Sequence, residues 1–179
     1  DAVGGCETAW KLQFRGTMEP VRPDSARMMA QIMLLQFRFS NFRSFRDTQE
    51  LSFIAESGGE HAEWLLDSKT APGGVARVAA LYGANASGKT NVIQALAFAI
   101  RAVRESFRVW EPGAEIPRVP FWLEPRSLKA PSEFEFSLEL GAVRYDYGFA
   151  VDDRRVRAEW LRAYPRGGKQ GWFIRDGDE

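Results

Sequence analysis

The chain has 179 residues, 45% of them hydrophobic and 13% aromatic, which is enough for one globular domain and too few for two ordinary ones. Its 24 basic and 24 acidic residues balance, which excludes a strong overall field of the kind that attracts nucleic acids or membranes. A single cysteine, Cys6, excludes an internal disulfide and a cysteine zinc cluster, and the absence of a run of about 20 apolar residues predicts no membrane span and a cytoplasmic location.

Residues 1–32 precede the first periodic segment. They mix glycine, proline and charges of both signs without helical or strand periodicity, and they are predicted to be a disordered upstream extension. Met28, Met29 and Met33 are alternative start residues, because regular patterning begins at Met33. Residues 33–179 are expected to form the folded unit.

Two candidate strands open this unit. In residues 33–40 the side chains of Leu35, Phe37 and Phe39 alternate with polar ones, the pattern of a half-buried strand. After a turn-like segment, residues 49–54 form a second candidate strand. Together they predict a hairpin.

A loop is predicted for residues 56–75, which are rich in Gly, Glu, Ser and Pro, with one helical turn near 62–66. The only histidine, His61, lies in this loop. No second histidine, cysteine or spaced pair of carboxylates accompanies it, so neither metal binding nor catalysis is expected of His61.

The most informative segment follows. Residues 78–82 form a short apolar run that ends at a glycine, typical of a strand buried on both faces. The pattern GxxxxGK[ST] comes next and consists of Gly83, Ala84, Asn85, Ala86, Ser87, Gly88, Lys89 and Thr90. Residues 90–107 then have apolar side chains at helical spacing and positive charge near their end, which predicts an amphipathic helix stopped by residues 111–113.

This pattern is a phosphate-binding P-loop. Gly83 and Gly88 permit a tight turn whose N–H groups point at phosphate oxygens, where a Cβ atom would block the approach. Lys89 would contact the β- and γ-phosphates, and Thr90 would bind Mg²⁺ through its hydroxyl. Because the motif stands between a predicted strand and a predicted helix, we expect the chain to bind ATP with Mg²⁺. The alternative, a glycine-rich turn without a ligand, is disfavoured.

A β-meander is predicted after the helix. Apolar and polar side chains alternate in residues 134–140 and 143–151, and further strands are expected at 156–164 and 172–175. The pair Asp176-Gly177 is a hairpin-turn signal that requires a returning strand, so the chain is expected to be truncated.

A hydrolytic carboxylate is harder to find. Phosphoryl transfer needs an acid that orients Mg²⁺ from a neighbouring strand, and the one candidate is the run Phe-Ala-Val-Asp-Asp at 149–153. Since the run alternates like a meander strand and passes into a turn, Asp152 and Asp153 are predicted to be turn residues. No catalytic residue is assigned.

The last hairpins are locally basic, and their basic side chains have two possible roles. A solvated sheet face is favoured over a contact with a nucleic-acid backbone for these side chains: Arg154, Arg155, Arg157, Arg162, Arg166 and Lys169. Similarly, Trp160, Trp172 and Phe173 are predicted to be core residues in preference to base-stacking platforms.

In combination, these segments resemble the ABC-like AAA-family ATPases related to the RecF, SMC and OLD heads. The resemblance covers 33–179 and is carried by Asn41-Phe42-Arg43-Ser44-Phe45, by LYGANASGKTNVIQAL, by Pro120-Phe121-Trp122-Leu123, and by GAVRYDYGFAVDD followed by EWLRAYPRG. It implies an α/β P-loop NTPase of the ABC-ATPase head type, of which this chain is the truncated N-terminal lobe with an antiparallel β-meander beside a central sheet.

The resemblance also implies ATP hydrolysis and head-to-head homodimerisation around two nucleotides. By the same analogy Arg43 approaches the nucleotide phosphates, while Asn41 and Phe42 shape that edge; an exposed turn arginine is the alternative. The family's signature motif, Walker B acids, D-loop and switch histidine are not recognisable here. Hydrolysis by this chain therefore stays open, and a partner chain could provide the rest of the ATPase.

Two other functions remain as alternatives. One is a non-catalytic module in which the nucleotide gates binding of DNA or of a protein partner. The other is a small-molecule kinase, which is disfavoured because the β-rich sequence after the helix has no candidate substrate-binding acid and no lid arginine cluster.

Overall fold

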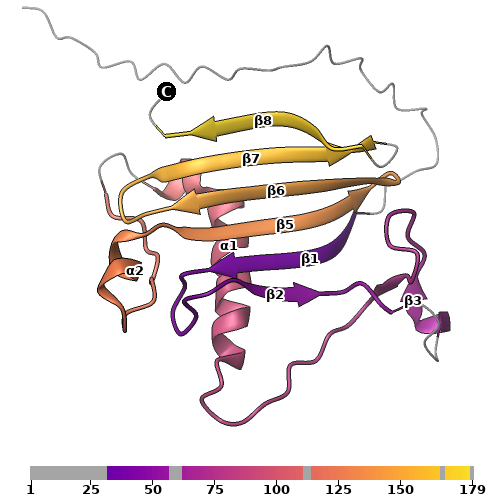
Figure 1. Ribbon diagram of the computed structural model, residues 1–179, viewed down its shortest axis with the longest axis horizontal. Helices are drawn as coiled ribbons and strands as arrows, with labels where there is room; N and C mark the ends of the chain where they lie inside the picture. The colour runs from indigo at the N-terminus through magenta and orange to yellow at the C-terminus, as the bar shows by residue number, and fades with distance from the viewer. Residues whose placement is uncertain (1–31, 57–61, 111–113, 166–167, 178–179) are drawn as a thin grey trace, which may run out of the picture.

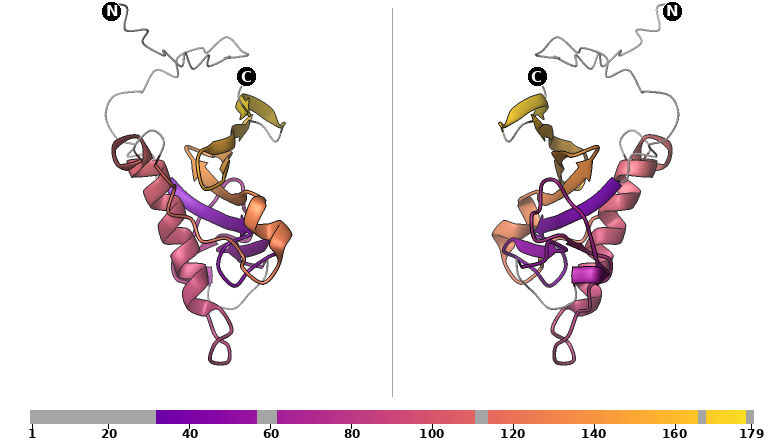
Figure 2. Two further views of the ribbon diagram at one scale, coloured as in Figure 1. Left: turned by 90° about the vertical axis from the view of Figure 1, so that its left-hand side faces the viewer. Right: turned by 90° about the vertical axis from the view of Figure 1, so that its right-hand side faces the viewer.

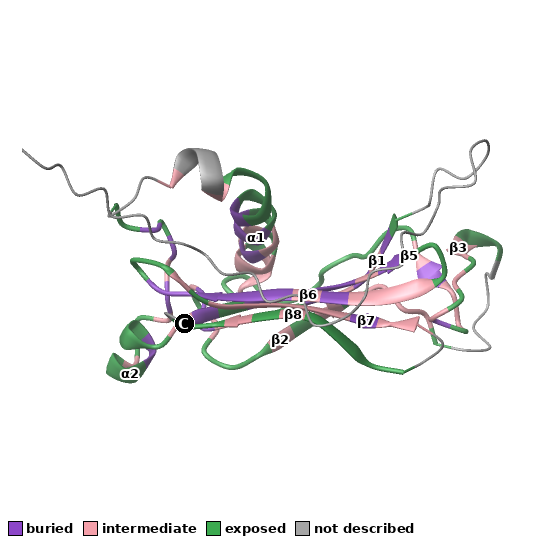
Figure 3. Cartoon of the chain, turned by 90° about the horizontal axis from the view of Figure 1, so that it is seen from above, coloured by how far each residue is buried: buried purple, intermediate pink, exposed green. Residues whose placement is uncertain are grey.

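The computed structural model describes residues 32–56, 62–110, 114–165 and 168–177. The strands of the main sheet are antiparallel and stand in the order β2-β1-β5-β6-β7-β8, and a long helix crosses one face of this sheet (Figure 1, Figure 3). The strands of this sheet are β1 (Ile32–Ser40), β2 (Gln49–Ser52), β5 (Ser132–Leu140), β6 (Val143–Val151), β7 (Val156–Tyr164) and β8 (Gln170–Asp176). The other elements are η1 (Ala62–Trp64), β3 (Leu65–Leu66), β4 (Val75–Ala76), α1 (Lys89–Val109) and α2 (Pro125–Lys129).

The sheet follows from the alternating sequence. Apolar side chains at every second position of β5 and β6 meet across the pairing, so that Phe134 lies opposite Phe149 and Phe136 opposite Tyr147. The hairpin of β1 and β2 and the meander of β5 to β8 are therefore confirmed. The pairing of β1 with β5 joins these two parts into one sheet.

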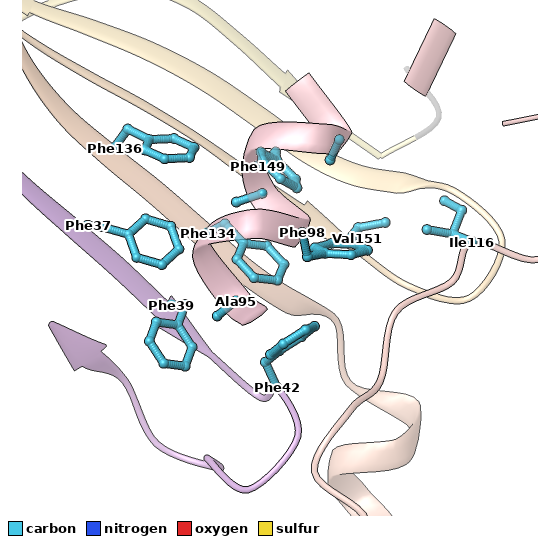
Figure 4. Packing of buried hydrophobic residues seen from close by; sticks show 12 residues of the cluster. Phe37, Phe39, Phe42, Ala95, Phe98, Ile116, Phe134, Phe136, Phe149 and Val151 are labelled. Atoms are coloured by element: carbon cyan, nitrogen blue, oxygen red, sulfur yellow. The ribbon is translucent and has the colours of Figure 1, made fainter. Parts of the chain in front are cut away.

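The main core lies between the sheet and α1. Small side chains on the helix, Ala95 and Ala99, allow it to approach a layer of phenylalanine rings on the strands (Figure 4). Phe134 is at the centre of this layer, with ring centroids 5.6 Å from Phe42, 5.1 Å from Phe98 and 5.3 Å from Phe149. The core thus fixes α1, and with it the segment at the start of the helix, to the sheet.

One face assignment was wrong. Leu35 was predicted to lie with Phe37 and Phe39, but it packs in a second cluster with Ala71 and Val75. The register of β1 against β5 shifts between Leu34 and Gln36, and such a bulge turns the side chain at the shift away from its expected face.

Residues 78–82 do not form the strand predicted for them. They have no regular secondary structure, and Val78 and Tyr82 are 80% and 91% exposed. A strand buried on both faces needs paired neighbours and a covering layer on each side. Within the described ranges all strand pairings are antiparallel and involve other segments, so the central sheet implied by the expected fold class is not among them.

The aromatic residues of the last strands are less buried than predicted. Trp172 is exposed because it lies on β8 at the edge of the sheet, and its ring forms a T-shaped pair with the ring of Tyr145. Trp160 is half-buried and lies over Gly148, where an added Cβ would come within 2.3 Å of the indole. The core assignment is therefore wrong for Trp172 and right only in part for Trp160.

Three of the basic residues in this region pair with acids across the strands. Arg157 contacts Asp152, Arg162 lies 3.1 Å from Glu135, and Arg175 lies 2.9 Å from Glu159. These pairs agree with the solvated sheet face expected from the sequence.

Several expectations fall on residues outside the described ranges, namely the extension before residue 32 with Cys6, the loop residue His61, and the helix stop at 111–113; the side chain of Phe107 also lies outside them. The predicted helical turn near 62–66 is present in part, as η1 over Ala62–Trp64, whereas Leu65–Leu66 form the short strand β3 that pairs with β4. In the part of the chain that is described, no helix is long and apolar enough to cross a membrane.

A buried carboxylate attaches the loop after β3 to the sheet. Glu139 on β5 accepts hydrogen bonds from the hydroxyls of Ser68 and Thr70, at 2.6 and 2.5 Å, and from the backbone N–H groups of Lys69 and Thr70. Burial raises the pKa of Glu139, but these four hydrogen bonds together outweigh it and hold the pKa below its ordinary value.

This clamp predicts a loss of stability in acid. Because the folded-state pKa of Glu139 is lowered, its contribution is complete above the ordinary glutamate value of about 4.3 and is lost as the pH falls through the folded-state pKa. We expect Glu139→Gln to lower the free energy of unfolding by about 1–2 kcal/mol at pH 7, and by less below pH 4. Urea unfolding at both pH values measures this. Glu133→Gln, an exposed acid on the same strand, is the control, and an equal loss in both variants would contradict the clamp.

Candidate nucleotide-binding site

The P-loop connects the unpaired segment 78–82 to the start of α1, at the end of the helix that extends beyond the sheet (Figure 2). Both of its glycines stand where a side chain would collide with the protein itself. A Cβ on Gly83 would come within 2.9 Å of the Ser87 hydroxyl, and a Cβ on Gly88 within 2.6 Å of the Phe45 ring. Gly88 also has a φ of +93°, a conformation that favours glycine.

Lys89 lies folded against the loop. Its ammonium donates hydrogen bonds to the backbone carbonyls of Gly83 and Ala84, at 2.8 and 2.6 Å. The side chain thus bends back over the turn that precedes it, and its charge lies beside the loop backbone. A phosphate bound by this loop would lie close to that charge.

The start of α1 adds to the positive potential. The N–H groups of Lys89 and Thr90 belong to the first turn of the helix, where they have no intrahelical partner and where the helix dipole is positive. Thr90 is exposed beside them. The loop, the ammonium and the helix start therefore form an arrangement that can bind phosphate oxygens, with a hydroxyl available for a cation.

The turn of residues 41–45 packs directly on this loop. The ring of Phe45 and the hydroxyl of Ser44 are the atoms closest to Gly88, and the amide of Asn91 on α1 donates a hydrogen bond to the Ser44 hydroxyl at 2.8 Å. The resemblance included all five residues of this turn but implied a role for the first three alone. The contact of Ser44 with Asn91 was not predicted, because a serine and an asparagine 47 positions apart carry no signal of their contact.

Asn41 anchors the turn from the other side. Its buried side-chain amide donates to the carbonyls of Ser127, Ala130 and Pro131 and accepts a hydrogen bond from the N–H of Phe121. The resemblance implied that Asn41 shapes this edge. The structure brings Asn41 to the segment around α2.

Arg43 lies in the same turn, with a φ of +52°, and its N–H donates to the carbonyl of Val119 at 2.7 Å. Its guanidinium lies 5.7 Å from the ring centroid of Phe42. The buried Nε of Arg43 has no hydrogen-bond partner among the described residues. Arg43 is thus next to the residues that contact the P-loop, with an unused donor.

The two aspartates after β6 both form structural contacts. Asp152 accepts hydrogen bonds from the N–H groups of Arg154 and Arg155, at 2.7 and 2.9 Å, and contacts Arg157. Burial raises the pKa of Asp152, but the hydrogen bonds and Arg157 outweigh it and lower the pKa. The structure confirms the prediction that Asp152 and Asp153 are turn residues.

Asp153 forms an ion pair with Arg118, at 2.7 Å. Arg118 also donates to the carbonyls of Leu128 and Ala130 and to the hydroxyl of Ser132. Sequence reasoning missed Arg118, because one arginine in an irregular segment has no periodicity. Among the described residues no three histidine, cysteine or acidic side chains gather as a metal-binding group.

Comparison with known proteins identifies the family of the chain. No curated protein matches the sequence. A family model described as "AAA domain, putative AbiEii toxin, Type IV TA system" matches residues 78–179, more than half of the chain, and the match includes the whole P-loop. An AAA-type domain indicates a P-loop nucleotide-binding protein. The chain therefore belongs to this family of AAA domains.

Proposed function

We propose that this chain binds ATP together with Mg²⁺ on the loop from Gly83 to Thr90. The observation that carries the proposal is that the Lys89 ammonium, the glycine turn and the start of α1 come together in one loop. Thr90 is the residue that would hold Mg²⁺, through its hydroxyl, and a bound Mg²⁺ would neutralise charge on the phosphates. The exposed Thr90 fits a bound Mg²⁺, and the tight turn, which leaves no room for a Cβ at Gly83 or Gly88, fits a bound phosphate.

Arg43 is proposed as a second phosphate contact. It adjoins Ser44 and Phe45, which contact Gly88. The proposal extends to a cytoplasmic P-loop ATPase of the ABC-like head type. There, the chain forms a head-to-head homodimer or associates with a partner chain, and a partner chain provides the Walker B acids and the signature motif.

A test of the proposal compares the full chain with Lys89→Ala. Because Lys89 provides the charge that meets the phosphates, we expect the variant to bind a fluorescent ATP analogue with Mg²⁺ about 10- to 100-fold more weakly. Lys129→Ala, which removes an exposed lysine on α2, is the control and should bind as the unmodified chain does. Equal affinity of Lys89→Ala and the unmodified chain would exclude the P-loop as the binding site.

One observation favours a second candidate, a nucleotide-gated binding module without turnover. Both Asp152 and Asp153 are engaged by structural partners, so neither is free to orient Mg²⁺. In that case ATP would bind, and phosphate release by the chain alone would be no faster than in the Lys89→Ala variant. Turnover that depends on Lys89 would exclude this candidate.

A further inference from the structure

The P-loop receives no strand support from the segment that precedes it. Residues 78–82 are exposed and take part in no strand pairing within the described ranges. Residues 83–87 are exposed as well, and the N–H of Ser87 donates within the loop, to the carbonyl of Ala84 at 3.3 Å. An exposed loop has to be ordered when it binds a ligand, and this ordering lowers the affinity unless another part of the fold holds the loop in place.

The turn of residues 41–45 reaches the loop from the sheet. A Cβ at Gly88 would lie 2.6 Å from the Phe45 ring and 3.1 Å from the Ser44 hydroxyl, so both side chains pack against the backbone of Gly88. The side-chain amide of Asn91 donates a hydrogen bond to the same hydroxyl at 2.8 Å. Gly88 is the N-cap residue of α1. The turn therefore contacts the chain at the point where the loop becomes the helix.

This turn is itself fixed to the core. Phe42 and Phe45 exchange backbone hydrogen bonds of 2.9 and 3.0 Å, which close the turn. The ring of Phe45 forms a T-shaped pair with the ring of Phe39, with centroids 5.4 Å apart, and Phe39 is buried on β1. A group bonded to Ser44 is therefore held at a defined position relative to the sheet.

The choice of residue at position 91 supports a role in the loop over a role in the helix. Asparagine is a poorer helix former than alanine, because its amide competes for nearby backbone groups. The amide of Asn91 instead bonds the Ser44 hydroxyl, 47 positions away in the sequence. We propose that Ser44 and Asn91 are positioning residues for the nucleotide, whose hydrogen bond holds Gly88 and the start of α1 in the conformation that binds phosphates. This rests on the proposed function and adds two residues to the same site.

The test removes this hydrogen bond from either side in the full chain. With Mg²⁺ present, we expect Ser44→Ala and Asn91→Ala each to weaken binding of a fluorescent ATP analogue about 3- to 10-fold. Because both variants lose the same bond, the double variant should bind no more weakly than either single variant. Ser44→Thr, which keeps the hydroxyl, should retain the affinity of the unmodified chain.

Two further measurements separate positioning from a general structural role. Urea unfolding should change little, because Ser44 is exposed and Asn91→Ala introduces a better helix former. Binding of inorganic tripolyphosphate, measured by competition with the analogue, should fall by the same factor as ATP binding, because the bond acts on the loop that holds the phosphates. The control is Thr48→Ala, which removes an exposed hydroxyl from the same connection between β1 and β2 and should leave both affinities unchanged.

The outcomes distinguish this inference from the proposed function. Unchanged affinity in both single variants, or losses that add in the double variant, would overturn the positioning role while leaving a Lys89-dependent phosphate site intact. A loss for ATP without a loss for tripolyphosphate would also overturn it and would assign the two side chains to contact with the nucleoside. A loss that follows from unfolding of the variants in buffer would overturn it too. If the unmodified chain binds neither compound, both the positioning role and the proposed function fail.

Discussion

Replacing Arg118 by methionine is expected to lower the free energy of unfolding by about 2–3 kcal/mol. The side chain of Arg118 is only 1% exposed, and its guanidinium bonds Asp153, two backbone carbonyls and the Ser132 hydroxyl. Methionine keeps much of the volume but removes all four hydrogen bonds of the guanidinium, and although Asn41 still donates to the Ala130 carbonyl, the Leu128 carbonyl and the Ser132 hydroxyl lose this donor, and unsatisfied buried polar groups are costly. Urea unfolding followed by circular dichroism measures the change.

Arg126→Met is the control for this prediction. Arg126 is exposed on the neighbouring helix α2, so its replacement should change stability by no more than about 0.5 kcal/mol. A loss in Arg118→Met no greater than in Arg126→Met would mean that the buried guanidinium does not hold the segment around α2 to the turn after β6.

The second large effect is expected at Phe134. Its ring is fully buried and contacts the rings of Phe42, Phe98 and Phe149. Truncation to alanine removes the apolar burial and leaves a cavity between α1 and the sheet, which costs about 3–5 kcal/mol. Thermal and urea unfolding of Phe134→Ala would measure this loss of stability. If the variant keeps a loosely packed fold, its free energy of unfolding should depend less steeply on the urea concentration.

Phe173→Ala gives the comparison for Phe134. Phe173 is half-buried on the edge strand β8, so less apolar surface is lost and neighbouring groups can fill the space. We expect a loss of about 1 kcal/mol there. Similar losses in the two variants would contradict a core centred on the helix and on strands β1, β5 and β6.

Much of the fold could be predicted because local patterns determine it. The alternation in β5 and β6 and the helical spacing after Lys89 each define a buried face within one segment. Leu35 was misplaced because a bulge depends on the pairing partner, which the strand's own sequence does not encode. Residues 78–82 were misplaced for a related reason, since an apolar run becomes a buried strand only where neighbours cover it.

The candidate site, too, could be predicted only where its residues are neighbours in the sequence. The glycines, Lys89 and Thr90 could be identified because the P-loop is contiguous in sequence, and the requirement for glycine at Gly88 is explained by the nearby Phe45 ring. The hydrogen bond of Asn91 to Ser44 could not be predicted, because it joins segments distant in sequence. Asn41 entered only through a family resemblance, and its bonds to the segment around α2 required the fold.

The pairing of β1 with β5 has a consequence for the order of folding. The meander from β5 to β8 is made of sequence neighbours, and hairpins of this kind form on a timescale of about microseconds. Phe37 on β1 pairs with Phe136 on β5, so this contact must close a loop that contains α1 and the whole P-loop. Loop closure of that length is entropically unfavourable and slow compared with hairpin formation. We therefore expect the turn of Ser44 and Phe45 to reach Gly88 late, which makes the nucleotide site one of the last parts of the chain to assemble.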